Sequence, residues 1–515
     1  MNNFILDVGS ETVPFPHYWE LCVGSCHAAL ALREDYRQHL TKCSKELGFK
    51  YIRFHGLFTD DMSVLHYGRG GALSGSKPIL SFMNIDSVFD YLLSIGMKPF
   101  VELGFMPKAL TGGTSEIFHY RALTSPPDDY GKWQWLVEQF AQHCVERYGL
   151  DEVRQWFFEV WNEPNLGIPD KYLFWGGTQE DYFKLYEVSA RGLKNVDHRL
   201  KVGGPATSHN AWIPEFIEYC RKNDVPLDFI STHHYPTDDA GGTTLNDILS
   251  ATQKLQKGEV GHEAVAEAMA KMAHSKATQW QRVERGILTK KAKKAKEEAD
   301  GLPLYYTEWS VQTGPNSDGP FGASFVSKTI MDNAGLVDGY SYWTFSDIFE
   351  EHGMPHKEFH GNYGLMTLHG IPKALYGAFR LLNKLGTERY IRQYASKTVD
   401  IYAVRKKEIG VIQILAVNHE SFEKEISDEE ITIQITGLSS YVGATIERVD
   451  EDNGNPLKGF IEMGSPDYIR ESEWHELMGA SSIKTTTLEA KFCEGTAELS
   501  FVLPKQGVAL ITIYE

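Results

Sequence analysis

The residues best suited to chemistry are two glutamates that each close an apolar, strand-like run. Glu163 follows Asn162 in "RQWFFEVWNEPNLG", residues 154–167, and Glu308 lies near the end of "LPLYYTEWS", residues 302–310. An acid at the tip of an apolar strand is costly to bury without a partner, so its presence there needs an explanation. Two opposed carboxyl groups could protonate a leaving oxygen and attack a carbon, which is the chemistry of glycoside hydrolysis.

The competing interpretation treats each glutamate as a core residue satisfied by hydrogen bonds. For either Glu163 or Glu308 alone, that interpretation is the simpler one. Both glutamates, however, occupy matching strand ends in aromatic surroundings, which favours a shared function.

Strand-like segments alternate with helical segments along most of the chain. Several helical segments have Gly just past the last apolar residue, the usual C-cap signal. This alternation predicts parallel strands joined by helices, and eight strands match a (β/α)8 TIM barrel. A doubly wound sheet is disfavoured because no G-x-G-x-x-G follows an early strand. The strand candidates are residues 19–25, 51–56, 98–105, 155–163, 201–206, 227–235, 302–310 and 339–347.

In such a barrel, the C-terminal ends of the strands meet at one rim, where active sites are built. Further polar and aromatic residues end strand candidates and should lie on that rim: His55, His233, Tyr235, Trp343 and, at the first strand, His27. Sugars offer hydroxyls to hydrogen-bond and apolar faces to stack on aromatic rings, which these residue types match.

Two rival functions fit parts of the same pattern. A metal-dependent hydrolase could use His55, His233 and His234, but no H-E-x-x-H motif is present, so we expect no metal and no cofactor. Cys22 and Cys26 are expected to be packing residues, because this segment lacks the four ligands that zinc prefers. A carbohydrate-binding protein without catalysis is the second rival, and it predicts no turnover of any glycoside.

A long connection, residues 236–301, follows the sixth strand candidate and should emerge at the rim. Its Ala-, Lys- and Glu-rich composition predicts at least two helices, and "KKAKKAKEE" within it reads as a solvated helix face. It could block the pocket beyond a terminal sugar, or equally decorate the surface or join subunits. The apolar positions expected to face inward are Ile248, Leu255, Val265, Met269 and Met272.

After residue 388 the pattern changes to period-two alternation without helical runs, which predicts an antiparallel β-sandwich. The expected organisation is an N-terminal strand within 1–14 that pairs with the accessory sheet, a catalytic barrel over 15–387 and a sandwich over 388–515.

Composition narrows the class of protein. The chain has 515 residues, a net charge of −18, 42% hydrophobic and 23% charged residues. The negative charge argues against a nucleic-acid partner, and no apolar run is long enough to span a membrane. Scattered cysteines and the absence of a signal-peptide pattern predict a cytoplasmic enzyme; a homo-oligomer is compatible with the sequence.

The motifs together resemble glycoside hydrolase family 39, in particular its bacterial β-xylosidase branch. The segments that carry the resemblance run in order through the barrel region and include "YIRFHGL", "KPFVELGFMPK", "FFEVWNEPNL", "PLDFISTHHY", "YTEWS" and "SYWTFSDIFEE". The C-terminal sandwich also resembles that family's accessory domain. One departure is "SCHAALAL", where a Gly-Arg type sequence is expected, so His27 should alter the pocket wall.

The resemblance implies residue roles and a reaction. Glu163 would be the general acid/base, Glu308 the nucleophile, and Asn162 a ligand of the sugar 2-hydroxyl. The implied activity is a retaining, exo-acting β-xylosidase acting on short xylo-oligosaccharides without a cofactor; alternatives within the family are α-L-arabinosidase, β-glucosidase and α-L-iduronidase. Retention predicts carboxyl groups about 5 Å apart. The residues that would shape the glycone pocket are His55, His233, Tyr235, Trp343 and Glu351.

Overall fold

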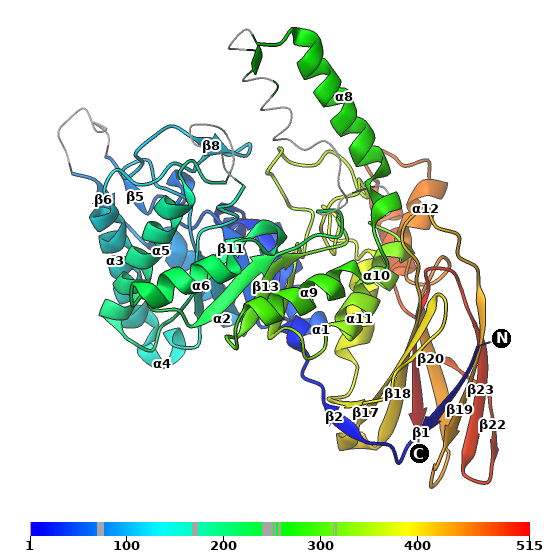
Figure 1. Cartoon of the computed structure of the whole chain (residues 1–515). Helices are drawn as coiled ribbons and strands as arrows, with labels where there is room; N and C mark the ends of the chain where they lie inside the picture. Colours follow the sequence, from blue (N-terminus) through cyan, green and yellow to red (C-terminus); the bar gives the residue numbers. More distant parts are fainter. Residues whose placement is uncertain are drawn as a thin grey trace.

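The structure is a computed structural model that describes residues 2–68, 77–166, 174–238, 251, 254–255, 259–312, 314 and 317–514. A barrel and a β-sandwich lie side by side, and both chain ends lie in the sandwich (Figure 1). Among the described residues, no helix is long and apolar enough to cross a bilayer.

The barrel confirms the predicted fold class. Eight parallel strands close in the order β10-β11-β12-β13-β14-β3-β4-β7, and each corresponds to one predicted strand. The observed strands are mostly shorter than the apolar runs that predicted them. Their bounds are β3 (Cys22–His27), β4 (Tyr51–His55), β7 (Lys98–Leu103), β10 (Phe157–Val160), β11 (Lys201–Thr207), β12 (Phe229–His233), β13 (Leu304–Trp309) and β14 (Gly339–Tyr342).

Helices surround the barrel, and local sequence explains their ends. The first helix stops at Gly48, which adopts φ +77° and caps the helix in the left-handed conformation. The fifth begins with a capping box between Thr178 and Asp181. The helices are α1 (Glu34–Leu47), α2 (Met83–Ser94), α3 (Tyr130–Tyr148), α4 (Leu150–Val153), α5 (Gln179–Val196), α6 (Ile213–Lys222), α9 (Ile287–Glu298), α10 (Pro320–Asp332) and α11 (Ala374–Asn383).

An aromatic plug closes the N-terminal end of the barrel. It consists of residues near the starts of the strands, including Tyr51, Phe100, Phe157 and Phe229, with Cys22 packed among them. The opposite, C-terminal rim is where the strand-end polar residues lie. The loops there also carry two small hairpins, β5 (Leu65–His66) with β6 (Ile79–Leu80) and β8 (Glu116–Ile117) with β9 (Ala122–Leu123).

The connection after β12 differs from expectation in extent. Helix α9, which contains "KKAKKAKEE", contacts α6 and α10 and is the regular barrel helix between β12 and β13. It buries Leu288, Ala292 and Ala295, whereas Lys290 and Lys294 face solvent. The lysine-rich segment is therefore a solvated helix face, and the insertion itself ends before α9.

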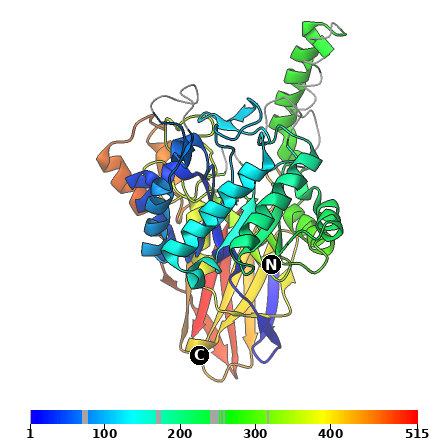
Figure 2. The same ribbon diagram turned by 90° about the vertical axis from the view of Figure 1, so that its left-hand side faces the viewer.

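The remaining helix of this connection, α8 (His262–Thr278), projects away from the barrel in both views (Figures 1 and 2). The expectation that Met269 faces inward is wrong, because its side chain is 53% exposed. Leu255 and Val265 are half-buried. Ile248 and the side chain of Met272 lie outside the described residues.

The C-terminal region forms two sheets. One has the order β1-β19-β23-β22 and the other β2-β15-β17-β18-β24-β20-β21, with β16 beside β17. The chain's first strand, β1, pairs in parallel with β19, and β2 pairs with β15. The bounds are β1 (Asn2–Asp7), β2 (Thr12–Pro14), β15 (Glu388–Tyr390), β16 (Tyr394–Ala395), β17 (Val399–Lys406), β18 (Val411–Asn418), β19 (Glu429–Thr436), β20 (Gly443–Val449), β21 (Thr486–Thr487), β22 (Ala490–Cys493), β23 (Thr496–Leu503) and β24 (Val508–Tyr514).

The expectation that this region lacks helices is wrong. Helices α12 (Pro456–Glu462) and α13 (Glu471–Ala480) interrupt it between β20 and β21. Their buried residues Phe460 and Leu477 pack with Phe359 and Ile371 of the loop after β14. The two helices are too short for helical periodicity to stand out against the surrounding strands.

Candidate active site

Glu163 lies just past β10 on a tightly held turn. Trp161 and Glu163 adopt φ values of 72° and 46°, a left-handed conformation that non-glycine residues adopt mainly where surrounding contacts enforce it. The Glu163 amide donates to the Ala206 carbonyl at 2.8 Å. Asn165 and Ser208 exchange two hydrogen bonds, at 3.0 and 2.8 Å, which join the loops after β10 and β11. The side chain of Glu163 is thus aimed by two loops together.

Glu308 lies near the end of β13 and accepts two hydrogen bonds. Arg53 Nη1 donates to Oε1 at 2.8 Å, and the Tyr235 hydroxyl donates to Oε2 at 2.9 Å. Both donors are buried. A guanidinium and a hydroxyl directed at one carboxylate stabilise its ionised form.

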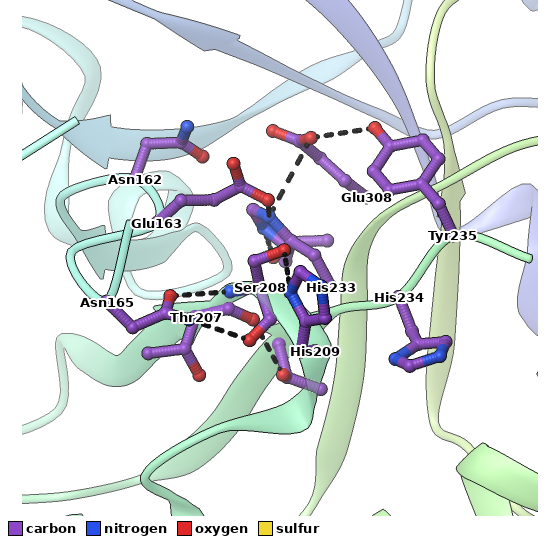
Figure 3. Close-up of polar contacts among 12 residues, drawn as sticks. Asn162, Glu163, Asn165, Thr207, Ser208, His209, His233, His234, Tyr235 and Glu308 are labelled. Carbon is purple, nitrogen blue, oxygen red and sulfur yellow. Dashed lines mark hydrogen bonds and ion pairs between the residues drawn. The ribbon is translucent and has the colours of Figure 1, made fainter. Parts of the chain in front are cut away.

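The two candidate carboxyl groups face each other across the rim (Figure 3). One carboxylate oxygen of Glu163 lies within 4.8 Å of one of Glu308. This separation agrees with the spacing of about 5 to 5.5 Å found in retaining glycosidases rather than the 6.5 Å or more of inverting ones.

The two groups have unequal environments. Burial and the negative charge of Asp238 together raise the pKa of Glu163 to about 7, against a lowering by His209. Glu163 therefore keeps its proton near neutral pH, whereas Glu308 accepts from Arg53 and Tyr235. One protonated and one ionised carboxyl is the pairing that acid-assisted displacement requires.

Arg53, in β4, connects the site and was not among the predicted residues. It is fully buried and contacts Glu159, Asn162, Glu308 and also, at 3.0 Å, Glu102. A charged residue inside the apolar run "YIRFHG" was the available signal, because a buried guanidinium requires carboxylate partners.

Asn162 is oriented by Arg53. Its Oδ1 accepts from Arg53 Nη2 at 2.8 Å. Its Nδ2 is buried and has no hydrogen-bond partner in the described part of the chain. A buried, unpaired amide beside two carboxyl groups is available to a ligand hydroxyl.

His55 and Glu351 meet at the rim beside Glu308. His55 Nδ1 lies 2.7 Å from Glu102, and its Nε2 lies 3.6 Å from Glu308 and 3.8 Å from Glu351. Burial lowers the pKa of His55 to about 3, so the ring is neutral. Burial and the nearby Glu308 raise the pKa of Glu351 well above its usual value. Both side chains can therefore offer uncharged donors to a ligand.

His233, the last residue of β12, bridges the loop after β10, which carries Glu163, and the end of β13, which carries Glu308. Its Nδ1 lies 3.1 Å from Glu163 Oε1 and 3.7 Å from Glu308 Oε2, and its Nε2 lies 3.0 Å from Thr307 Oγ1. Trp343, just past β14, is buried with its ring centroid 4.7 Å from that of His55. The structure thus gathers both residues at the predicted rim.

His27 ends β3 and is buried rather than exposed at the wall. It forms a short contact with Glu350 and stacks on Tyr120 with centroids 3.9 Å apart. Its Nδ1 also lies 3.5 Å from Asp61. His27 thus holds Glu350, the residue next to Glu351, in place.

The metal site expected by the rival interpretation is not assembled. His234 points away from both carboxyl groups (Figure 3), whereas His55 and His233 point toward them. A different trio in the described residues, Glu163, His233 and Glu308, has potential ligand atoms within 4.8 Å of one another. These atoms already contact each other or Arg53 and Tyr235.

Two carboxyl groups at this separation on the C-terminal rim of a (β/α)8 barrel are what double displacement at a glycosidic bond requires, so the class of protein is a retaining glycoside hydrolase. The family model for glycosyl hydrolases family 39 matches residues 4–276 and 259–497. The chain belongs to that family, as its sequence motifs predicted.

Similar proteins cover nearly the whole chain. A β-xylosidase of Caldicellulosiruptor saccharolyticus is 48% identical over 98% of this chain and 97% of its own length. A β-xylosidase of Geobacillus stearothermophilus is 34% identical over 97% and 93%, respectively. The crystal structure of a monomeric β-xylosidase from Caulobacter crescentus superposes with a TM-score of 0.79 at 30% identity, covering 100% of this chain and 99% of that one.

Proposed function

We propose that this protein is an exo-acting β-xylosidase that releases xylose from the non-reducing ends of short xylo-oligosaccharides. The observation that carries the proposal is the opposed pair Glu163 and Glu308, with carboxylate oxygens within 4.8 Å and unequal surroundings. Two relatives matched over more than nine-tenths of the chain bear the name β-xylosidase, which supports the choice of sugar.

The proposed mechanism is a double displacement. Glu308 attacks the anomeric carbon while Glu163 donates its proton to the leaving oxygen, and the glycosyl–oxygen bond breaks as the glycosyl–carboxylate bond forms. Glu163 then takes a proton from water as that water attacks the anomeric carbon and frees Glu308. Asn162, through its unpaired Nδ2, hydrogen-bonds the sugar 2-hydroxyl next to the reacting carbon.

The glycone pocket would be formed by His55, His233, Tyr235, Trp343 and Glu351, with His27 acting through Glu350. The two candidate carboxyl groups are nearly inaccessible, with Glu163 6% and Glu308 4% exposed. An enclosed site of this kind suits a terminal sugar better than the interior of a polymer chain.

The α-L-iduronidase alternative is less favoured by charge. On the side of the rim formed by residues 350 and 351, Glu350 has a pKa lowered by its hydrogen bond to His27, so it would present an anion to an iduronate carboxylate. Arg53 is already engaged by Glu159, Glu102 and Glu308. A neutral pentose or hexose avoids this repulsion.

We also propose a reducing, cytoplasmic location and a role in xylan degradation after endo-acting cleavage. All six cysteines are free thiols and five are buried, which supports a chain that does not depend on disulfides.

A panel of nitrophenyl glycosides, together with xylobiose, tests the proposal. We expect the highest kcat/KM on the β-xyloside, and proton NMR should show β-xylose as the first product. A tenfold or larger preference for an arabinoside, glucoside or iduronide would show that xylose is not the preferred glycone. A first product of the α anomer would contradict the double displacement.

A further inference from the structure

We propose that Thr307, held by Glu159, is a positioning residue that fixes the tautomer of His233 and so keeps the acid proton on Glu163. The inference rests on the proposed function, in which Glu163 is the general acid. It adds a buried chain of hydrogen bonds, Arg53–Glu159–Thr307–His233–Glu163, whose direction follows from the donors and acceptors along it.

This chain of hydrogen bonds begins with an ion pair in the barrel interior. Arg53 Nε donates to Glu159 Oε2 at 2.6 Å, and both side chains are fully buried. Burial alone would raise the pKa of Glu159, but the Arg53 charge, together with His233 and the hydroxyls of Ser231 and Thr307, outweighs burial, and the pKa lies below its usual value. Glu159 is therefore a carboxylate and can only accept hydrogen bonds.

The direction of the next bond follows. Thr307 Oγ1 lies 2.7 Å from Glu159 Oε1 and donates its one hydrogen there. The hydroxyl can then only accept from its second neighbour, His233 Nε2, at 3.0 Å. The proton of the imidazole must therefore be on Nε2.

The other ring nitrogen is consequently unprotonated. His233 is fully buried, and burial lowers its pKa, so the ring is neutral and carries one proton. Nδ1 lies 3.1 Å from Glu163 Oε1, and a bare nitrogen at this distance needs a proton on the oxygen. Glu308 is farther, at 3.7 Å, and accepts from Arg53 and Tyr235. The proton therefore belongs to Glu163.

Other charged groups face this pair and act in the background. His233 is faced by Glu308, Arg53, Glu159 and Glu102. Glu163 is faced by Asp238, His209, Arg53, Glu308 and Glu351, and the Ser208 hydroxyl also hydrogen-bonds to it. None of the groups facing Glu163 contacts His233 Nε2, so the tautomer is set through Thr307.

The opposite tautomer would have the opposite effect. An Nδ1–H group would donate to Glu163 and stabilise its carboxylate, so Glu163 would lose its proton at lower pH. Valine has the shape of threonine but neither accepts nor donates, whereas serine keeps the hydroxyl. Thr307→Val and Thr307→Ser are therefore a matched pair.

The experiment measures kcat/KM against pH for both variants on xylobiose and on dinitrophenyl β-xyloside. For Thr307→Val we expect the basic limb to move about one unit lower, with a loss on xylobiose of about fivefold at pH 7 that approaches tenfold at pH 8. The loss on the dinitrophenyl substrate should stay within about threefold, because its leaving group needs little protonation. Thr307→Ser should stay within about threefold of wild type on both substrates.

A second variant gives an independent reading should Thr307→Val fold poorly. In Glu159→Gln the carbonyl must face Arg53, so the new amide nitrogen donates to Thr307, whose hydroxyl then turns toward His233 Nε2. This reversal should move the basic limb in the same direction. An unmoved limb in a folded variant, an equal loss on both substrates, or a Thr307→Ser variant as impaired as Thr307→Val would overturn the proposal.

Histidine ¹⁵N spectra test the tautomer without any substrate, with the His233 signals assigned as those lost in His233→Gln. An Nε2-protonated ring in the wild type that changes in Thr307→Val supports the proposal, and an Nδ1-protonated wild-type ring overturns it. A wild type that is inactive on both xylosides would contradict the proposed function instead, so the two failures are distinguishable.

Discussion

At the scale of single residues, the unequal surroundings of Glu163 and Glu308 determine the pH dependence. Because the pKa of Glu163 is raised to about 7 and the acid must be protonated, kcat/KM should fall as pH rises through about 7. Asp238→Asn removes a negative charge that faces Glu163, so its pKa should fall and the basic limb should move about 0.5 to 1 unit lower. Asp300→Asn, an equal charge change at an exposed position, is the control. An unmoved limb would contradict the role of Asp238.

The roles of the two glutamates are separable by leaving group. Glu163→Ala should lose about 10²- to 10⁴-fold on xylobiose but much less on dinitrophenyl β-xyloside, which needs little protonation. Azide should restore turnover and give a β-glycosyl azide, because the small anion enters the vacated space. Glu308→Ala should fail on both substrates, since no covalent intermediate can form. Indistinguishable variants would contradict the assignment.

The two glutamates could be predicted from sequence because they follow apolar strands, where a carboxyl group is conspicuous. By contrast, the partners of these groups lie within strands and point into the barrel: Arg53 and Glu159 form an ion pair, and Thr307 donates a hydrogen bond to Glu159. A strand with two buried faces has no polar side to read, so alternation does not reveal which polar residues meet. These residues become partners because the fold brings together β4, β10 and β13, which are far apart in the sequence.

At the scale of elements, close backbone packing on β3 positions Trp343. A Cβ added at Gly24 would lie 2.4 Å from Trp343 Cε3, so Gly24→Ala should displace the indole ring. We expect KM for the β-xyloside to rise about tenfold or more, since a shift of about 1 Å near the site can have large effects. Gly479→Ala, where an added Cβ meets nothing within 4 Å, should leave KM unchanged. Equal KM values for the two variants would contradict this positioning role.

The insertion between β12 and α9 is the part of this connection that a deletion can remove while the barrel helix α9 is kept. Its base is anchored by Trp280, which packs against Phe321 and Phe422, and α9 must be retained. An oligomer contact is one of the roles expected for the insertion, and α8 stands away from the barrel with Met269 exposed. If α8 makes that contact, replacing residues 241–276 with a short Gly/Ser linker should lower the number of copies per particle measured by light scattering. The matched control Lys271→Ala should leave that number unchanged.

The same deletion tests the alternative that the insertion limits substrate length. If the shortened protein keeps its number of copies per particle but gains activity on longer xylo-oligosaccharides, a wall over the pocket is the better explanation. The sequence predicted helices in this connection but not which of them packs against the barrel, because a projecting helix and a barrel helix such as α9 can both be rich in Ala and Lys. Only the contacts of α9 with α6 and α10 separate the two.

At the scale of the whole molecule, ion pairs fasten the sandwich to the barrel. Arg285 donates to the carbonyls of His419 and Thr398 and pairs with Asp400, which Lys328 contacts at 3.2 Å. Arg285→Ala should destabilise the protein by about 2 to 3 kcal/mol, because it leaves the His419 carbonyl without its donor and Asp400 with Lys328 as its remaining cation. The exposed Lys290→Ala should change the free energy of unfolding by less than about 0.5 kcal/mol. Denaturant titration checks both, and equal midpoints would contradict the fastening role.

The strand β1 links the order of synthesis to the order of folding. Asn2 pairs with Ile431, so β1 is synthesised about 430 residues before the strand that it pairs with. At 5–20 residues per second, that delay is roughly 20 to 90 s. Throughout it, the barrel can fold while an unpaired strand edge trails from its start, open to a second nascent chain. The sandwich, which is made after the barrel, therefore completes a strand that is made before the barrel. Changes in residues 2–7 should alter the expression yield and leave the activity of the folded protein unchanged.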